Sequence, residues 1–302
     1  MMQLSKSHSQ FRILVCNKDM PVRKIYIDSR FAISGASTNE FTVELPESFT
    51  TGPNTKGQVL DATIPHTWHN VETGVNDKLY YIERTNLLQN IAKIITIPAG
   101  NYTRETIATT LLGLLNANKE VSNFGTYSVN TTGTNATQGT ITVTLSTGAF
   151  AIVPDSDLKQ QSFYDLQWRP IMSGPAYDIN DPQSCNEMFR VVESTGFVGA
   201  WTPIHVDMLH VHTVFLHCSD LVSSYDNMGP QGERGIIRRI GIDVPYNYVQ
   251  QVQTSGSPYD YFECANRTIK TLKFSIRTAK NKALNFHGTH CSFCIVFFDT
   301  DE

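Results

Sequence analysis

The chain has 302 residues, and its 24 lysines and arginines against 28 aspartates and glutamates give a formal net charge of −4 at pH 7. This length suits one large β domain with an insertion, or two domains. Without a segregated basic tail, the chain is a poor match for nucleic acid as its main partner, because phosphate binding needs a concentrated positive face. Charged residues make up 17% of the chain, below the ~25% of an average domain, as is typical of a subunit that hides much of its surface in contacts.

The scattered cysteines and the lack of long apolar segments indicate in which kind of cellular compartment the protein is found. The six cysteines are scattered and do not form the framework of a small disulfide-rich domain. The N-terminal residues MMQLSKSHSQF contain no apolar signal core, and no run of about 18 apolar residues is present to span a membrane. We therefore expect a soluble protein that is made and kept in a reducing compartment.

The first part of the chain reads as an arm followed by strands. Residues 1–23 are polar apart from the apolar stretch Phe11 to Cys16, and we expect an arm that docks on another surface. The segment FTVELP alternates between apolar and polar residues, and we expect Pro46 to end its strand. Residues 24–85 form the first part of the main β domain, with strands expected at residues 24–28, 41–45, 58–64 and 78–83.

The pattern changes over residues 86–160, where a strand is followed by a helix and three more strands. Thr103 is placed to cap a helix that runs to about Asn118, and apolar residues recur along it at helical spacing: Ile107, Leu111, Leu114 and Leu115. The three later strands are expected in the segments YSVN, TITVTL and AFAIV. Such a unit can make a small two-layer body, which we place as an α+β insertion between two halves of the main β domain.

Residues 161–302 are expected to complete the main β domain. Their first part is loop-rich, with one short helix expected over residues 182–190, in which Asp181 is the N-cap and Pro182 the first helical position. Strands are expected at residues 208–217, 235–244, 246–253, 268–278 and 291–298. Many strands punctuated by Pro and Gly, with two helices, predict a sandwich or a barrel.

The closing segment THCSFCIVFFD is apolar on both faces of a strand. Phe293, Ile295 and Phe297 share one face, and Val296 and Phe298 make the opposite face apolar as well. A strand of this kind is covered on both sides. Burial of the three side chains on the first face contributes about 2 kcal/mol each, so we expect this strand at the centre of the β core.

The segment HVDMLHVHTVFLHC holds the first candidate metal site. His210 and His212 would share one face of a strand, as the metal-binding histidines of cupin jelly rolls do, and His205 and Asp207 could substitute for further ligands. The carboxylate that follows the pair in such sites is missing, and His217 stands in that region instead. Histidines at a solvent or subunit face are the commoner case. A cupin-like metalloenzyme is therefore an alternative interpretation.

A second candidate has the spacing H-x-x-H-C-x-x-C and consists of His287, His290, Cys291 and Cys294. Zinc sites usually draw another ligand pair from a separate turn, and the chain has no second C-x-x-C. Alternation along a strand puts Cys291 and Cys294 on opposite faces, which argues against chelation and against a redox pair. Core thiols are the simpler interpretation.

Motifs for catalysis are absent from the sequence. There is no G-x-S-x-G and no H-E-x-x-H. The segment GPQGERG lacks the Lys-Ser/Thr of a phosphate loop, and we expect an ordinary loop there. Carboxylates are dispersed, without a pair for general acid–base work. We predict no catalytic residue, no metal site and no cofactor, and hence a protein that is not an enzyme.

Several stretches, taken in order, resemble one known family. They are IYIDSRFAISGASTNEFTVELPESF, VLDATIPHTWHNVETGVNDKLYYIE, ITIPAGNYTRETIATTLLGLLN, LHVHTVFLHCSD, RGIIRRIGIDVP and TIKTLKFSIRTAKNKALNFHGTHCSFCIVFF. The chain resembles the penton (vertex) capsid proteins of virophages and Maverick/Polinton-type viruses, with mavirus-like virophage pentons nearest. The resemblance covers most of residues 24–298, through pattern and order rather than a rigid signature.

The resemblance implies an all-β fold, an upright single jelly roll of eight antiparallel strands. Its two parts would be residues 24–85 and 161–302, with the inserted subdomain at 86–160. It also implies a homopentamer at the fivefold vertices of an icosahedral capsid, whose flanks contact trimers of a double-jelly-roll major capsid protein. The protein would reside in the virion after synthesis in the host cytoplasm, and the family carries no catalytic residues to transfer.

The arm, residues 1–23, would tether the subunit to neighbouring subunits, or to minor capsid or internal proteins. Neither a membrane span nor specific nucleic-acid binding is expected. Two alternatives from other classes stay open, the cupin-like metalloenzyme at His210 and His212 and a β-sandwich module that binds glycan or protein.

Overall fold

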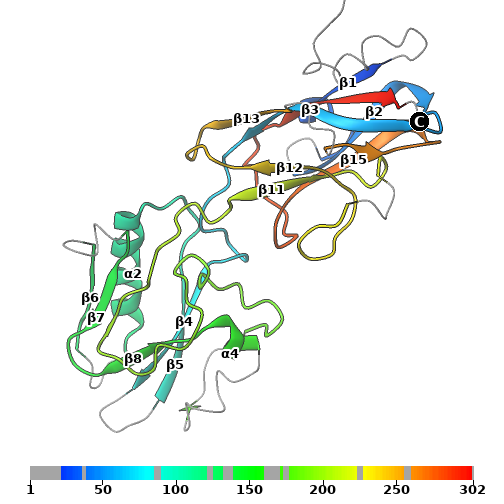
Figure 1. Ribbon diagram of the computed structural model, residues 1–302. Coiled ribbons are helices and arrows are strands. Elements are labelled where there is room, and N and C mark those ends of the chain that lie inside the picture. The colour runs from blue at the N-terminus through cyan, green and yellow to red at the C-terminus, as the bar shows by residue number, and fades with distance from the viewer. Residues whose placement is uncertain are drawn as a thin grey trace, which may run out of the picture. The chain divides into compact units, whose positions relative to one another are not determined.

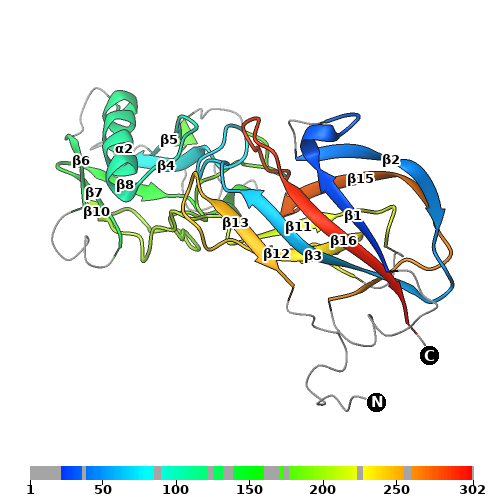
Figure 2. The ribbon, with the colours of Figure 1, turned by 90° about the horizontal axis from the view of Figure 1, so that it is seen from above.

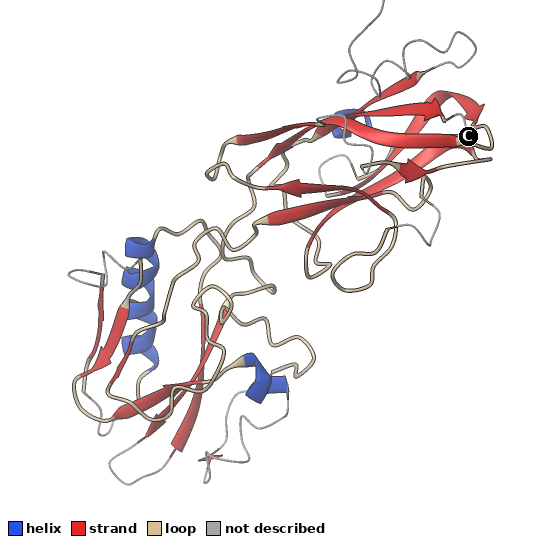
Figure 3. Ribbon diagram, viewed as in Figure 1, coloured by secondary structure: helices blue, strands red, loops and turns tan. Residues whose placement is uncertain are grey.

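The computed structural model describes residues 22–35, 39–84, 90–120, 125–131, 139–159, 171–172, 177–222, 227–254 and 260–300. Residues 1–21 of the expected arm lie outside these ranges. The chain forms two compact units, of which unit 1 consists of Met1–Trp68 and Val211–Glu302 and unit 2 of His69–His210. Strands dominate the described residues (Figure 3). None of the described helices has both the length and the apolar character to cross a membrane.

Unit 1 is built from two antiparallel sheets, drawn in Figures 1 and 2. Its strands are β1 (Arg23–Asp28), β2 (Glu40–Thr50), β3 (Thr55–Pro65), β11 (Thr213–His217), β12 (Ile236–Gly241), β13 (Val249–Gln253), β14 (Phe262–Glu263), β15 (Thr268–Thr278) and β16 (Ser292–Asp299), and the 3-10 helix η2 spans Ser29–Phe31. The first sheet has the order β1-β16-β3-β13, with β14 also paired to β3, and the second has the order β12-β11-β15-β2.

The way in which the chain alternates between these sheets identifies the fold. With the short β14 set aside, the first sheet holds the first, eighth, third and sixth strands along unit 1, and the second sheet holds the fifth, fourth, seventh and second. This order, in which the strands of two facing sheets are shared between two Greek keys, is that of a jelly roll. The all-β jelly roll that the sequence predicts is therefore confirmed.

The closing strand β16 lies between β1 and β3 (Figure 2). On its inner face, the ring of Phe293 packs against Phe274 and Phe41 of the second sheet, with centroid separations of 4.9 and 6.4 Å. On the opposite face, Phe298 packs edge-on against Tyr261 at 5.0 Å. Both faces of the strand are thus covered, as the apolar pattern of its sequence indicates.

Pro46 does not end its strand, contrary to our expectation, because β2 continues through it. Since β2 is an edge strand of the second sheet, one side of its backbone makes no ladder, and a proline is tolerated there. The pairing with β15 also shifts between Ile269 and Thr271. At this bulge Lys270 donates from Nζ to the carbonyl oxygen of Pro46 at 3.2 Å, which satisfies a backbone group that the ladder leaves out.

Unit 2 combines two small sheets with helices. Its elements are β4 (Lys78–Arg84), β5 (Asn90–Thr96), α2 (Arg104–Asn118), β6 (Tyr127–Asn130), β7 (Thr142–Leu145), β8 (Ala149–Ile152), α4 (Asp155–Lys159), β9 (Ile171–Met172) and β10 (Ala200–Trp201). The sheets have the orders β8-β4-β5-β9 and β10-β7-β6. The helix α2 is drawn in Figure 1. Thr103 caps it, and its residues Ile107, Leu111 and Leu115 are buried in the core of unit 2, so the helix predicted from spacing and capping is confirmed.

The compact units divide the chain at other residues than the expected 85 and 161. The strand β4, which we assigned to the main β domain, pairs with β5 and β8 of unit 2. Likewise β10, which follows residue 161, pairs with β7. The sequence KLYYIE is apolar on both faces, so its pattern indicates a buried strand but not which sheet it joins. Pairing between distant segments decides that, and the inserted unit therefore reaches from His69 to His210.

The prediction of a helix at residues 182–190 is wrong, since the structure has no helix there and residues 186–190 form a turn. Gln183 and Arg190 have φ angles of 53° and 52°, in the left-handed region that a right-handed helix does not use. Ser184 forms a parallel bridge with Lys78, at the start of β4. Pairing to a neighbouring strand thus overrides the local Asp-Pro helix signal.

A carboxylate is fully buried in unit 2. Glu83 accepts a hydrogen bond from the Tyr127 hydroxyl at 2.8 Å and another from the Glu120 backbone N–H at 2.9 Å. Burial is the main cause that raises the pKa of Glu83, and these hydrogen bonds and the nearby Lys93 work against it. Because the folded unit then holds the proton more tightly than the unfolded chain, this residue favours folding increasingly as the pH falls through its folded pKa towards the unfolded value.

Replacing Glu83 by Gln should remove this pH dependence. The free energy of unfolding of Glu83→Gln relative to the wild type should be higher at neutral pH than near pH 5. Chemical denaturation followed by far-ultraviolet circular dichroism, to which α2 contributes, measures both. Parallel pH curves for the two proteins would show that the buried carboxylate does not titrate abnormally.

Replacing Phe293 by Asp should prevent soluble expression, because it places a charge in the core. Phe293 is only 2% exposed, and its ring packs against those of Phe41 and Phe274. Thr271→Asp, on the exposed side of β15, introduces the same charge and should express normally. Yield and melting temperature of the two variants give the comparison. A normal melting temperature for Phe293→Asp would contradict the assigned core.

Candidate functional site

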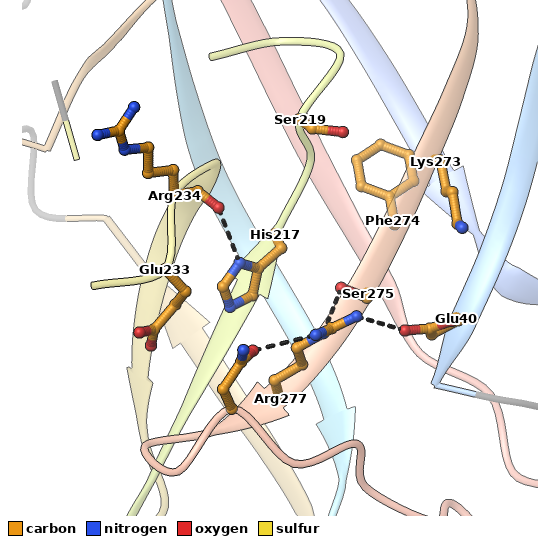
Figure 4. A pocket seen from close by; sticks show the side chains of 10 residues that line it. Glu40, His217, Ser219, Glu233, Arg234, Lys273, Phe274, Ser275 and Arg277 are labelled. Atoms are coloured by element: carbon orange, nitrogen blue, oxygen red, sulfur yellow. Dashed lines mark hydrogen bonds and ion pairs between the residues drawn. The ribbon is translucent and has the colours of Figure 1, made fainter. Parts of the chain in front are cut away.

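A polar cavity of about 240 Å³ lies in unit 1 (Figure 4). Side chains of β2, β11 and β15 and of the turn after β15 form one side, and the loop that precedes β12 forms another. The lining residues are Glu40, His217, Ser219, Glu233, Arg234, Lys273, Phe274, Ser275, Arg277 and Asn281. Three basic and two acidic side chains meet a histidine here, a combination of groups that occurs in catalytic sites.

His217 is the buried titratable group of the cavity, with 8% of its surface exposed. Its Nδ1 lies 3.4 Å from the carbonyl oxygen of Arg234, and because a carbonyl only accepts, Nδ1 carries the proton in the neutral ring. Its Nε2 is buried without a hydrogen-bond partner among the described residues. Burial lowers the pKa of His217, and the charge of Arg277 lowers it further, so the ring is neutral at neutral pH.

Glu233 belongs to the loop GPQGERG, which is a loop as the sequence indicates. The backbone N–H of Gln231 donates to its Oε2 at 2.7 Å, whereas Oε1 is buried and has no partner in the described part of the chain. A Cβ at Gly229 would lie 2.1 Å from Oε1, so the carboxylate folds back directly over Gly229. The Glu233 side chain thereby forms one wall of the cavity.

Arg277 is held by three neighbours in Figure 4. It donates to Glu40 Oε1 at 2.6 Å, to Asn281 Oδ1 at 3.0 Å and to Ser275 Oγ at 3.2 Å. Glu40 therefore compensates its charge, and the Ser275 hydroxyl is oriented by the guanidinium. Because Glu40 is engaged by Arg277, two side chains of the cavity, His217 and Glu233, remain as possible metal ligands. A catalytic zinc site needs three protein ligands.

The first candidate metal pair is not placed as the sequence suggested. The strand β11 begins only after His212, and His210 has a φ of 57°, which a strand does not adopt. Hence the two histidines do not share a strand face. Asp207 pairs with Arg190 at 2.9 Å and also accepts from the backbone N–H of His210 at 3.2 Å, so it orders a turn, and His205 is exposed.

The second candidate set is divided between loop and core. His287 is exposed in a turn with a φ of 51°, and Nδ1 of His290 lies 3.3 Å from Ser29 Oγ. Cys291 and Cys294 are buried and unpaired. Burial raises the pKa of Cys291 to about 12 and also raises that of Cys294, so both thiols stay protonated, as core thiols do.

The buried thiols should therefore resist alkylation in the folded protein. At about pH 8, iodoacetamide should leave five cysteines unlabelled, because the thiolate is the reactive form: Cys185, Cys218, Cys264, Cys291 and Cys294. The same residues should react fully in denaturant, and mass spectrometry of peptides measures both states. Rapid labelling of Cys291 or Cys294 in the native protein would point to a reactive pair.

Large apolar side chains are exposed at both edges of the first sheet. We call the surface of β1 and η2 the β1 edge, where Tyr26 and Phe31 are 76% and 78% exposed. We call the surface of β13 and its preceding turn the β13 edge, where Tyr248 and Val249 are 63% and 48% exposed. Sequence reasoning missed these positions. The signal was an aromatic residue, Tyr26, on the polar side of an alternating strand.

The chain is similar to two solved virophage structures. One is the crystal structure of the mavirus penton protein, at 10% identity, with 94% of this chain and 100% of that chain covered and a TM-score of 0.48. The other is a chain in the cryo-EM structure of the Sputnik virophage, at 12% identity, with 94% and 98% covered and a TM-score of 0.41. No protein-family model matches the chain, and comparison with curated proteins gives no match.

Proposed function

We propose that the chain is a structural capsid protein, a homopentameric penton that occupies the fivefold vertices of an icosahedral virus particle and contacts the major capsid protein. The observation that carries this proposal is the pair of exposed apolar edges on one jelly-roll sheet. The sequence resemblance to pentons, set out above, is what names the vertex among the possible positions in a shell.

A closed ring requires two different contact surfaces on every subunit, because each copy meets one neighbour on either side. The β1 edge and the β13 edge are different surfaces at opposite margins of the same sheet. Each presents aromatic or aliphatic side chains whose exposure to water is unfavourable. A two-fold dimer would need only one such surface, used by both copies.

The chemistry of the cavity supports a role without catalysis. Arg277 is compensated by Glu40, His217 is neutral and has no hydroxyl or thiol bonded to it among the described residues, and Oε2 of Glu233 accepts from the backbone of its own loop. A nucleophile with an adjacent base is the usual requirement for covalent catalysis. We accordingly propose that the protein acts through its surfaces, in the virion, after synthesis in the host cytoplasm.

Co-expression with the major capsid protein of the same virus tests the proposal. We expect the chain in purified particles, with five copies around each fivefold axis in a cryo-EM reconstruction. The negative control is a particle preparation without the chain, whose vertices should be empty or open. A chain that stays monomeric and is absent from particles would contradict the proposal.

Removal of residues 1–20 should spare the fold and weaken incorporation into particles, since the ladder of unit 1 begins at Arg23 and the arm is proposed as a tether to other capsid components. Removal of residues 1–28 should abolish folding, because it deletes β1 from beside β16. Melting temperature and particle content separate the two effects. Loss of folding in the shorter deletion would mean that the arm belongs to the core.

Metal analysis distinguishes the cupin-like alternative. A stoichiometric transition metal in the purified protein, lost in the His210→Ala/His212→Ala double variant, would favour a metalloenzyme. The placement of these two histidines gives that alternative no support. A soluble monomer that binds glycan or a cellular protein and never enters particles would favour the module.

A further inference from the structure

We infer that neighbouring copies of this chain meet edge to edge, with the β1 edge of one copy against the β13 edge of the next. The inference rests on the proposed ring of copies and adds which residues make its contacts. It concerns unit 1 alone.

Strand direction permits this contact. Each strand of the first sheet is antiparallel to its neighbour, so β1 and β13, at the two ends of the order, run in opposite directions. Rotation of a copy about an axis along the strands keeps these directions. The β13 of one copy and the β1 of the next are then antiparallel, which is the arrangement that continues an antiparallel sheet. Among the described residues, neither strand has a second neighbour in the sheet.

Charges match at one end of the two edges. The ladder places Lys24 beside Val296, which lies beside Gln58 of β3. Glu263 of β14 pairs with β3 two positions away, at Lys56, and alternation puts Lys24 and Glu263 on the same face of the sheet. Lys24 is exposed and the Glu263 side chain is 61% exposed.

The position of β14 is fixed by close packing. The ring of Phe262 occupies the space over Gly57, where a Cβ would lie 2.3 Å from the nearest ring atom. Glu263 is therefore held at the margin of the sheet, and it is available to a cation of a neighbouring copy in addition to its own Lys56 at 3.8 Å.

Apolar side chains match at the other end. The same ladder places Asp28 beside Ser292, then Thr63, then Gln251 of β13. From this level β1 runs on into η2 and reaches Phe31, while β13 runs back to Val249 and Tyr248. Phe31 and Tyr248 thus lie at the same end of the two edges, whereas Tyr26 lies across the sheet from Gln253.

One arrangement of neighbouring copies brings together the charged residues at one end of the edges and the apolar residues at the other end. With the strands kept at equal levels, Lys24 of one copy approaches Glu263 of the next, and Phe31 approaches Tyr248 and Val249. A two-fold contact of β1 with β1 would instead bring the Lys24 end of one copy against the Phe31 end of the other. The match therefore favours a ring of head-to-tail contacts over a dimer.

Two aspartate substitutions test this assignment in the full-length chain. Phe31→Asp damages only the β1 edge and Tyr248→Asp only the β13 edge, and both side chains are exposed enough to keep the fold. Each should raise the dissociation constant of the contact about tenfold or more, as loss of an aromatic anchor does. Met228→Asp, at a residue 74% exposed on neither edge, is the matched control and should assemble as the wild type does.

Mixing the two variants gives the sharpest result. Each alone should be monomeric by native mass spectrometry and absent from particles. Together they should form dimers that grow no further, because one intact β1 edge meets one intact β13 edge and both outer edges are damaged. A mixture that stays monomeric would overturn the pairing of these two edges.

A charge exchange provides a second variant set that leaves the apolar residues untouched. Lys24→Glu and Glu263→Lys should each weaken assembly severalfold through like-charge repulsion, and the double variant should recover it. Single variants that assemble normally would overturn the charged part of the contact.

These outcomes separate the inference from the proposed function. Wild-type pentamers or vertex incorporation that Phe31→Asp and Tyr248→Asp leave intact would refute the edge contact and preserve the penton role. A wild-type chain that neither forms pentamers nor enters particles would refute both.

Discussion

The packing of Phe293 between the two sheets of unit 1 is the interaction on which the rest of the structure depends. Its ring meets Phe274 and Phe41 of the opposite sheet, and its strand, β16, lies between β1 and β3. Strands from the two ends of the described chain, β1 and β16, therefore pair with each other, and β16 lies in the middle of the sheet. Everything at the margins of that sheet, including the exposed aromatic residues of β1, is positioned by this central pairing.

The inserted unit does not interrupt the sheets of the jelly roll, because the chain leaves the jelly roll between two sheets. It departs after β3, in the first sheet, and returns at β11, in the second. A connection that passes between sheets can be lengthened without breaking a ladder, and its closure entropy grows only slowly with length. Unit 2 then satisfies its own core, in which α2 packs with two small sheets and Glu83 finds its partners within the same unit.

The polar cavity and the exposed edges contrast in a way that bears on function. In the cavity, Glu40 compensates the charge of Arg277 inside the chain, and burial keeps His217 neutral. At the edges, large apolar side chains face water in the isolated chain, and their burial by a partner would be favourable. The exposed edges of the described surface therefore support a role in assembly more than the cavity supports a role in catalysis.

The sequence by itself determined the features that depend on near neighbours along the chain. Thr103 and the spacing of Ile107, Leu111 and Leu115 specified α2, and alternation around Phe293 specified a strand buried on both faces. Tertiary structure alone decided that β4 joins the inserted unit, that β2 continues through Pro46, and that His210 leaves the strand. It also decided that Tyr26 and Tyr248 stand at opposite edges of one sheet. The reason is that strand pairing is non-local: a strand's own residues set which faces are apolar, whereas its neighbours in the sheet come from segments hundreds of residues away.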